Sequence, residues 1–252
     1  MLTKLDNSIK FGKQQGGFGI QVLYPANIRP NSKDTGIATI GRIDQAKVTP
    51  GTLIPMHPHR NDEILTYLRS GKVKHIDSEG LTEQISNQKL MMMNAGARFY
   101  HEELVLEEGG LLEGLQIFIR PDQQDLKPQV QFHNLSSIYS TNSWRKIAGR
   151  GADYPLQIRS NAWINDLRLE KTETINLPSL PAENVNLLFY VFDGIVQVKD
   201  GAILSKGESL LIEDENQTFI ALETSDVVLF VTEHSAPYFD GGMYSGNQQK
   251  SK

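Results

Sequence analysis

Two short segments of the sequence combine side chains that bind metals. The first contains His57-Pro-His59 and the second contains His101-Glu-Glu103. Residues i and i+2 of a β-strand point to the same face, so each segment presents two ligands on one face. Three neutral imidazole nitrogens and one carboxylate oxygen form a coherent ligand set for a divalent transition metal, with positions left for water or substrate. The residue types and their spacing therefore predict a metal site.

The composition limits the chemistry and the partners. The chain has 252 residues, no cysteine and a formal net charge of −5. Without cysteine, any metal must be held by nitrogen and oxygen ligands. The acidic balance and the absence of a run of five basic residues predict no direct binding of nucleic acid. No apolar run approaches the roughly 18–20 residues of a membrane span, and the first residues lack a secretion signal, so we expect a cytoplasmic protein without membrane contact.

Short runs of β-forming residues, separated by Gly, Asn, Asp and Pro, dominate the chain and predict an all-β protein. One short helix is expected over 135–143, and the aromatic residues spaced by glycines in 238–246 indicate a tail that folds back over a barrel. The predicted strands are 18–24, 36–46, 64–68, 71–76, 89–93, 111–119, 162–169, 187–192, 194–198, 209–213, 218–223 and 227–232.

An internal repeat organises these strands. The segment 63–75 aligns with 186–198, and each reads as a strand, a tight turn at Gly71 or Gly194, and a second strand. We therefore expect two sequential β-barrels, residues 1–130 and 131–252, joined by a linker within 121–152. The same alignment places Leu180, Ala182 and Asn186 where the first copy has His57, His59 and Glu63. Only the first barrel keeps the ligands, so one metal per chain is expected.

The spacing Gly51-x5-His57-x-His59-x3-Glu63 resembles the first motif of the cupin superfamily, and Asn94-Ala-Gly96 followed by His101 resembles the second one loosely. In the general cupin pattern Glu63 is the carboxylate ligand. The same-face pair His101 and Glu103 instead favours Glu103, with Glu63 near the metal as a base or hydrogen-bond acceptor. Glu63 could equally be a hydrogen-bonded carboxylate without a catalytic role, and the sequence leaves the choice between the two carboxylates open.

Four motifs within residues 36–128 occur together. They are Pro55-x-His57-Pro-His59-Arg60-x-x-Glu63, Gly71-x-Val-x-His75-x-Asp77-Ser78-x-Gly80, Ala95-Gly96-x4-His101-x-Glu103 and Leu115-Gln-Ile-Phe-Ile-Arg-Pro121. This set resembles the pirin family of two-barrel cupins. The chain departs from the usual family pattern at Asn61-Asp62 and at Phe99-Tyr100, next to the ligands. Within the second motif, His75 is expected to be an ordinary strand residue with a local partner.

The resemblance implies a monomer with one metal in the first barrel, bound by His57, His59, His101 and Glu103. Iron is the expected metal, with nickel, manganese, copper and zinc as alternatives. Some members of that family are flavonol (quercetin) 2,3-dioxygenases. Our leading hypothesis is therefore a quercetin 2,3-dioxygenase-like oxidoreductase acting on a flavonol or another hydroxylated aromatic or enediol substrate, with Glu103 or Glu63 as the catalytic carboxylate that takes up the substrate's proton. The alternative is a non-catalytic, metal-containing regulatory or redox-sensing protein that binds a protein partner.

Overall fold

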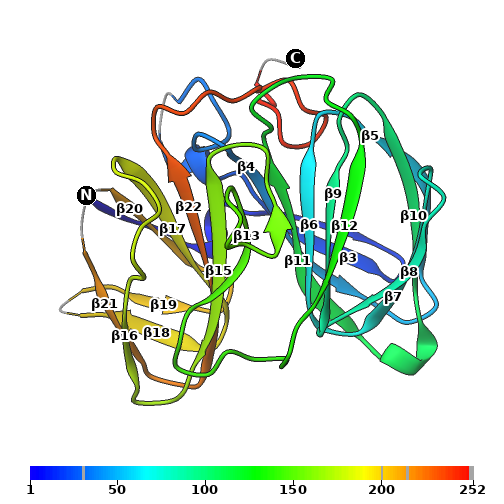
Figure 1. Cartoon of the computed structure of the whole chain (residues 1–252). Coiled ribbons are helices and arrows are strands. Elements are labelled where there is room, and N and C mark those ends of the chain that lie inside the picture. The colour runs from blue at the N-terminus through cyan, green and yellow to red at the C-terminus, as the bar shows by residue number, and fades with distance from the viewer. Residues whose placement is uncertain (30–31, 200, 214–215, 250–252) are drawn as a thin grey trace.

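The computed structural model describes residues 1–29, 32–199, 201–213 and 216–249. Within these residues the chain forms β-strands, turns and three short 3-10 helices, which confirms the all-β prediction (Figure 1). Each of the twelve predicted strands overlaps an observed one. The 3-10 helices are η1 (Asn7–Ile9), η2 (Pro25–Ile28) and η3 (Glu107–Gly109).

The helix expected over 135–143 is wrong, because that segment is irregular, with bends, a turn and an isolated bridge from Thr141 to Arg168. The carbonyls of Ser137 and Ile138 accept hydrogen bonds from the guanidinium of Arg145, and Arg69 also donates to Ile138. Leu135 is buried in a hydrophobic core. Contacts with distant side chains therefore replace the local hydrogen bonds that a helix requires.

The first barrel is an eleven-stranded sheet. Ten of its strands follow the order β2-β3-β4-β11-β6-β9-β8-β7-β10-β5, and the eleventh, β12, pairs with β9. Glycines in left-handed conformation, such as Gly71 (φ 84°), form the tight turns between strands. The strands are β2 (Phe11–Gln15), β3 (Phe18–Leu23), β4 (Ile40–Val48), β5 (Leu53–His59), β6 (Glu63–Ser70), β7 (Lys72–Asp77), β8 (Thr82–Ser86), β9 (Lys89–Asn94), β10 (Phe99–Val105), β11 (Leu112–Ile119) and β12 (Gln129–Asn134).

The second half contains a seven-stranded sheet, ordered β1-β20-β17-β22-β15-β13-β14, and a four-stranded sheet, ordered β16-β21-β18-β19. The first strand of the chain pairs with this half, while β12 pairs with the first half, so strand pairing crosses residue 130 in both directions. The strands are β1 (Leu2–Leu5), β13 (Arg145–Gly149), β14 (Leu156–Gln157), β15 (Ala162–Leu169), β16 (Thr174–Asn176), β17 (Val185–Asp193), β18 (Ile195–Val198), β19 (Ile203–Ser205), β20 (Ser209–Glu213), β21 (Thr218–Ala221) and β22 (Ser225–Glu233).

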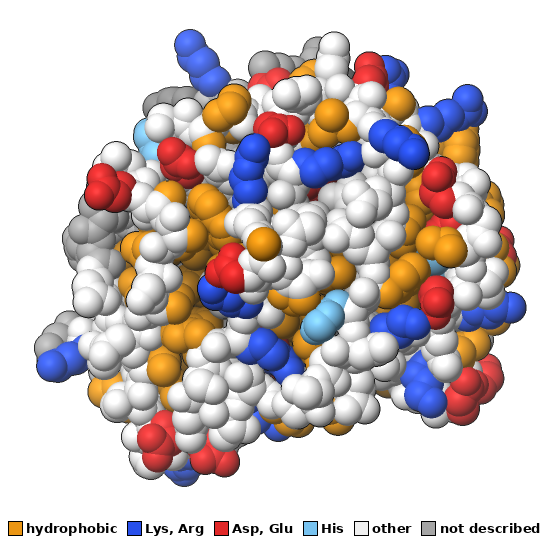
Figure 2. Space-filling model, viewed as in Figure 1, with side chains coloured by type: hydrophobic (Ala, Val, Ile, Leu, Met, Phe, Trp, Pro, Cys, Tyr) orange, Lys and Arg blue, Asp and Glu red, His pale blue; other side chains and the backbone are white. Residues whose placement is uncertain are grey.

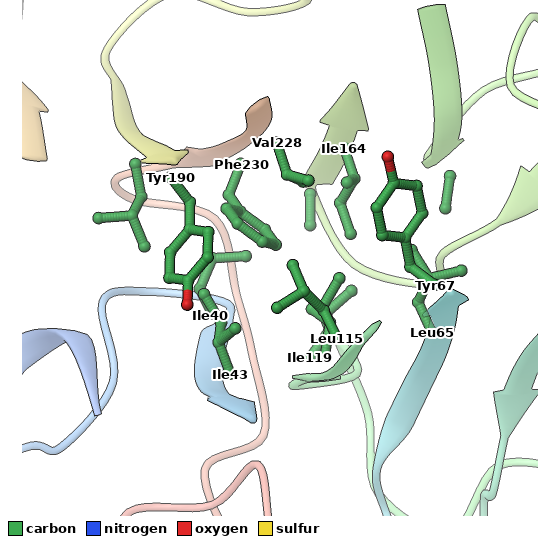
Figure 3. Packing of buried hydrophobic residues seen from close by; sticks show 14 of the residues in the cluster. Ile40, Ile43, Leu65, Tyr67, Leu115, Ile119, Ile164, Tyr190, Val228 and Phe230 are labelled. Carbon is green, nitrogen blue, oxygen red and sulfur yellow. The ribbon is translucent and has the colours of Figure 1, made fainter. Parts of the chain in front are cut away.

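The two halves share a hydrophobic core (Figure 3). Strand β6 shows why, because seven of its eight residues are buried. Ile64 and Leu68 pack inside the first barrel, whereas Leu65 and Tyr67 face the second half and contact its core. A strand that is buried on both faces needs a continuous apolar run instead of an alternating one.

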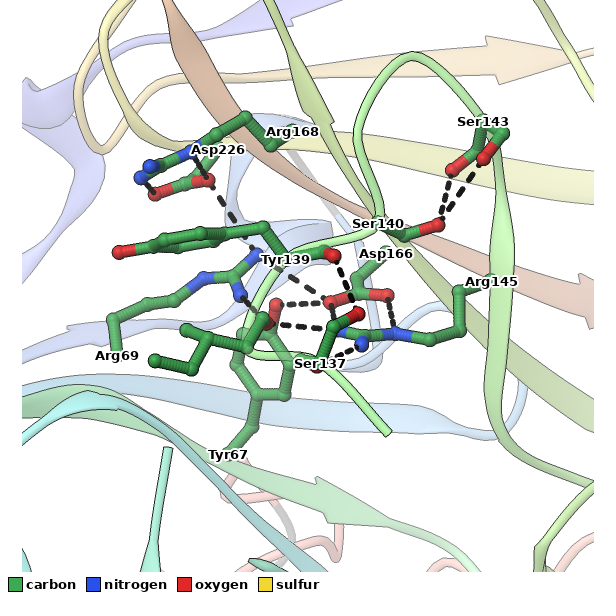
Figure 4. Close-up of polar contacts among 11 residues, drawn as sticks. Tyr67, Arg69, Ser137, Tyr139, Ser140, Ser143, Arg145, Asp166, Arg168 and Asp226 are labelled. Atoms are coloured by element: carbon green, nitrogen blue, oxygen red, sulfur yellow. Dashed lines mark hydrogen bonds and ion pairs between the residues drawn. The ribbon is translucent and has the colours of Figure 1, made fainter. Parts of the chain in front are cut away.

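A buried polar network lies beside this shared core (Figure 4). Asp166 of β15 accepts hydrogen bonds from the hydroxyl of Tyr67 (2.7 Å) and from the guanidinium of Arg145 (2.7 and 2.9 Å). Arg69 lies between Asp166 and Asp226, at 3.4 and 3.6 Å from their carboxylates. Arg168 also pairs with Asp226 (2.6 Å), so three guanidinium groups surround two buried carboxylates at the junction of the two halves.

The surface shown in Figure 2 carries acidic and basic side chains interspersed with each other. Among the described residues, no helix is long and apolar enough to cross a membrane.

Candidate metal centre

Strands β5 and β10 bring three imidazoles together. The two strands pair antiparallel, and His57 lies directly opposite His101. The ring centroids of His57 and His101 are 4.3 Å apart, and the ring of His59 lies 5.0 Å from each. The same-face pair predicted from the spacing of His57 and His59 thus meets its partner on the opposing strand.

The nitrogen atoms of this cluster fit a metal ion. Nε2 of His59 and Nε2 of His101 are 3.0 Å apart. Two nitrogens about 2.0–2.1 Å from one metal and at right angles to each other are separated by about 3 Å. His57 donates a hydrogen bond from Nδ1 to the carbonyl of Pro55 (2.9 Å), which leaves its Nε2 without a proton and free to bind. The ligand atoms of these three histidines all lie within 4.8 Å of one another.

The environment keeps imidazoles of this cluster uncharged. Burial lowers the pKa of His101, and the neighbouring His57, His59 and His75 lower it further. Burial also lowers the pKa of His57. Because a metal binds only unprotonated nitrogen, these shifts remove the competition from protons at neutral pH.

Glu103 lies on the other side of His101. Residues of β10 alternate between buried and half-buried, so His101 and Glu103 share the inner face as predicted. A register shift between them places Glu103 opposite Ile54 of β5, and its Oε1 lies 3.8 Å from Nδ1 of His101. Its Oε1 has no hydrogen-bond partner among the described residues. Burial raises the pKa of Glu103 to about 7.

Glu63 has a different set of neighbours. Its carboxylate accepts hydrogen bonds from Nε of Arg159 (2.5 Å), from the backbone N–H of Arg159 (2.7 Å) and from the amide of Asn94 (3.1 Å). Burial raises its pKa, against the opposing charge of Arg159. It belongs to neither of the two potential metal-binding groups found among the described residues. The structure therefore gives Glu63 a pairing with the second half of the chain, and a role as a base stays a prediction.

His75 is closer to this centre than the sequence indicated. It is a strand residue with a local partner, as expected, because its Nε2 lies 2.8 Å from Asp77. Its ring is also 5.3 Å from that of His101, and it forms a second potential metal-binding group with His101 and Glu103. The signal that could have indicated this position is the spacing His75-x-Asp77, a third i, i+2 pair of metal-binding residue types.

In the second half, the positions aligned with the ligands lie at a cavity of about 640 Å³. Leu180 and Ala182, aligned with His57 and His59, line it together with apolar and polar side chains, among them Val185, Glu183 and Asn216. Within the described part of the chain, neither potential metal-binding group includes residues of this half.

Comparisons with known proteins agree with the fold. Residues 29–119 match the Pirin family model. A Zymomonas mobilis protein with the provisional name quercetin 2,3-dioxygenase is 30% identical over 197 residues, covering 74% of this chain and 79% of that protein. The quercetin 2,3-dioxygenase of Escherichia coli K12 is 26% identical over 77% of this chain and 83% of its own length.

Solved structures show the same fold. The Escherichia coli bacterial pirin YhhW, crystallised in complex with nickel(II), superposes with a TM-score of 0.79 at 22% identity, covering 92% of this chain and 99% of that one. A quercetin 2,3-dioxygenase from Acinetobacter baumannii gives a TM-score of 0.76 at 23% identity, over 92% and 85% of the two chains. The architecture is that of a bicupin. The chain belongs to the pirin family.

Proposed function

We propose that this chain is a mononuclear metal-dependent dioxygenase that acts on a flavonol or another hydroxylated aromatic or enediol substrate. The observation that carries the proposal is the cluster of His57, His59 and His101, with the carboxylate of Glu103 next to His101. The names of the relatives support the reaction class, and the nickel complex of YhhW supports a divalent metal. Iron is our proposed metal, with nickel, manganese, copper or zinc as alternatives.

His57, His59 and His101 would hold the metal through neutral imidazoles. Glu103 is the proposed fourth ligand; in this structure its carboxylate lies at Nδ1 of His101 and would have to turn toward the Nε2 atoms to bind the same ion. A bound divalent metal would supply the positive charge that stabilises a deprotonated substrate and the route for electron donation to oxygen. The side chains and backbone of the protein orient the ligands and limit the access of water. The hydrogen bond to Pro55 fixes the ring of His57, and the buried strands around His101 keep bulk water out.

Glu103 is the base that we assign to this reaction. A buried carboxylate whose Oε1 has no hydrogen-bond partner among the described residues can accept a proton from a phenolic or enediol hydroxyl group. A positioned base of this kind contributes roughly 10²–10⁴-fold to the rate. Glu63 is already bonded to Arg159 and Asn94, so the proposal gives it no proton-transfer step.

The space around Glu103 defines how a substrate approaches. The cavity next to Glu103 has a volume of about 50 Å³, which accommodates a few water molecules. Sites that enclose a drug-sized ligand are several hundred Å³ in size. An aromatic substrate would therefore bind on the side of His57, which is only half-buried, and present its hydroxyl groups to the cluster.

Oxygen consumption tests the proposal. Metal-loaded protein is mixed with quercetin and related flavonols under air, and Glu103→Gln is compared with Glu102→Gln, whose side chain lies on the opposite face of β10. We expect steady oxygen uptake by the wild type and by Glu102→Gln, and a loss of at least 100-fold in Glu103→Gln. Metal binding without oxygen uptake on any substrate would contradict the enzyme proposal and support the non-catalytic, partner-binding alternative.

A further inference from the structure

The Nδ1 atoms of the histidine cluster, which would point away from the metal, differ in their hydrogen-bond partners. A histidine that binds metal through Nε2 carries its proton on Nδ1, and that proton needs an acceptor. For His57 the acceptor is the carbonyl of Pro55. Nδ1 of His59 is buried and has no hydrogen-bond partner within the described residues. The acidic group near it is Asp62, with Oδ2 at 3.6 Å.

Asp62 is a buried carboxylate held by the C-terminal segment. Its side chain is fully buried, and its Oδ1 accepts hydrogen bonds from the backbone N–H groups of Tyr244 (3.0 Å) and Ser245 (2.8 Å) and from the Ser245 hydroxyl (2.7 Å). Its Oδ2 lies 3.2 Å from the backbone N–H of Tyr244 and also faces Nδ1 of His59, at 3.6 Å. Among the described residues, Asp62 forms no ion pair with a Lys or Arg. Its negative charge is stabilised by N–H and O–H donors instead.

The C-terminal segment is itself fixed on the first barrel. The backbone N–H of Met243 donates to the carbonyl of Arg60 (3.0 Å), and Nε of the buried Arg120 donates to the carbonyl of Ser245 (2.9 Å). The ring of Tyr244 lies 5.2 Å from the ring of His59. The tail therefore forms part of the wall around this histidine, which agrees with the prediction that it folds back over a barrel.

We propose that Asp62, positioned by Tyr244 and Ser245, is the hydrogen-bond acceptor that orients His59 for metal binding, so that the C-terminal segment completes the metal centre. The proposal rests on the metal site of the proposed function. Asp62 acts through His59, and is a positioning residue. A carboxylate at Nδ1 selects the tautomer with a free Nε2 and raises the basicity of that nitrogen, and loss of such a partner typically weakens metal binding 10–100-fold.

The change Asp62→Asn tests this assignment. Asparagine keeps the size of the side chain, but one of its two ends must present an N–H₂ group either to His59 or to the donors of the tail. The matched control is Asp125→Asn, the same change at a carboxylate that bonds Arg60 and Asn61 of the same loop but lies away from His59. The affinity for Ni²⁺, measured by competition with a coloured chelator, should fall 10–100-fold in Asp62→Asn and stay unchanged in Asp125→Asn.

A second measurement separates positioning from folding and from the proposed function. Long-range ¹⁵N–¹H spectra of the metal-free wild type report the tautomer of each histidine. We expect His59 with its proton on Nδ1 in the wild type and in Asp125→Asn, and a shift toward the Nε2–H form in Asp62→Asn.

A proton on Nε2 of His59 in the wild type would overturn the assignment, even if Asp62→Asn does not fold. Unchanged Ni²⁺ affinity in a folded Asp62→Asn variant would overturn it as well. A wild type with the expected tautomer that binds no metal would instead contradict the proposed metal site.

Discussion

The polar network between the two halves should be a main source of stability, and Asp166→Asn is the change that tests it. Asp166 is fully buried and accepts hydrogen bonds from Tyr67 and Arg145, with Arg69 3.4 Å away. The substitution removes the negative charge and leaves the side chain of Arg145, 16% exposed, without a counter-ion. Arg69 keeps only the more distant carboxylate of Asp226 at 3.6 Å.

The expected loss follows from the burial of these charges. Removing one partner of a buried ion pair lowers the free energy of unfolding by about 3–5 kcal/mol. For a chain of this size each kcal/mol corresponds to about 2–4 °C, so Tm should fall by about 6–20 °C. Tyr67→Phe removes one hydrogen bond to the same carboxylate and should lower the stability less, by about 1.5–3 kcal/mol.

Urea and thermal unfolding of the two variants measure these losses. The control is Asp153→Asn, which breaks the exposed pair with Lys146 and should leave Tm unchanged. A Tm of Asp166→Asn within 2 °C of the wild type, or a larger loss in Tyr67→Phe than in Asp166→Asn, would refute the reasoning that the network is held by its buried charges.

Three further predictions concern other parts of the structure. Burial raises the pKa of Glu103 from 4.5 to about 7, so the folded metal-free protein binds more protons than the unfolded chain in this window and loses stability as the pH rises through it. In EDTA, the difference in the free energy of unfolding between Glu103→Gln and the wild type should therefore shift by about 3 kcal/mol in favour of the variant between pH 4.5 and 7. Curves of unfolding free energy against pH that run parallel for the two proteins would contradict this. Arg159→Ala leaves the buried carboxylate of Glu63 without its cation and should lower the free energy of unfolding by about 3–5 kcal/mol. Glu63→Gln removes the buried charge as well, and should lose less. A urea midpoint of Arg159→Ala equal to that of the wild type would argue against the pairing. Gly41→Ala places a Cβ 2.0 Å from the carbonyl oxygen of Ser245, so the tail should detach and become sensitive to limited proteolysis, whereas a protected tail would show that β4 does not hold it.

The sequence predicted the strands better than the contacts between them. Period-2 patterns and glycine turns identified twelve strands, because those signals are local. The helix expected over 135–143 failed because the segment's carbonyls bind Arg145 and Arg69, which are contacts that local propensity does not contain.

The same division applies to the candidate site. The spacing His57-x-His59 and the distal His101 were sufficient to predict a cluster, since strand geometry places such pairs on one face. The partner of Glu63 could not be predicted, because Arg159 lies 96 residues away in the chain. The closeness of Asp62 to the tail depends on a separation of more than 180 residues, which no sequence pattern encodes.

The metal content of the protein is the most direct test of the central claim. Tag-free protein is compared by elemental mass spectrometry with a His57→Ala/His59→Ala double variant, before and after anaerobic reconstitution. We expect about one redox-active metal per wild-type chain and none in a folded variant. An absence of metal from the reconstituted wild type, or equal metal in both proteins, would contradict the assignment of these histidines as the metal centre.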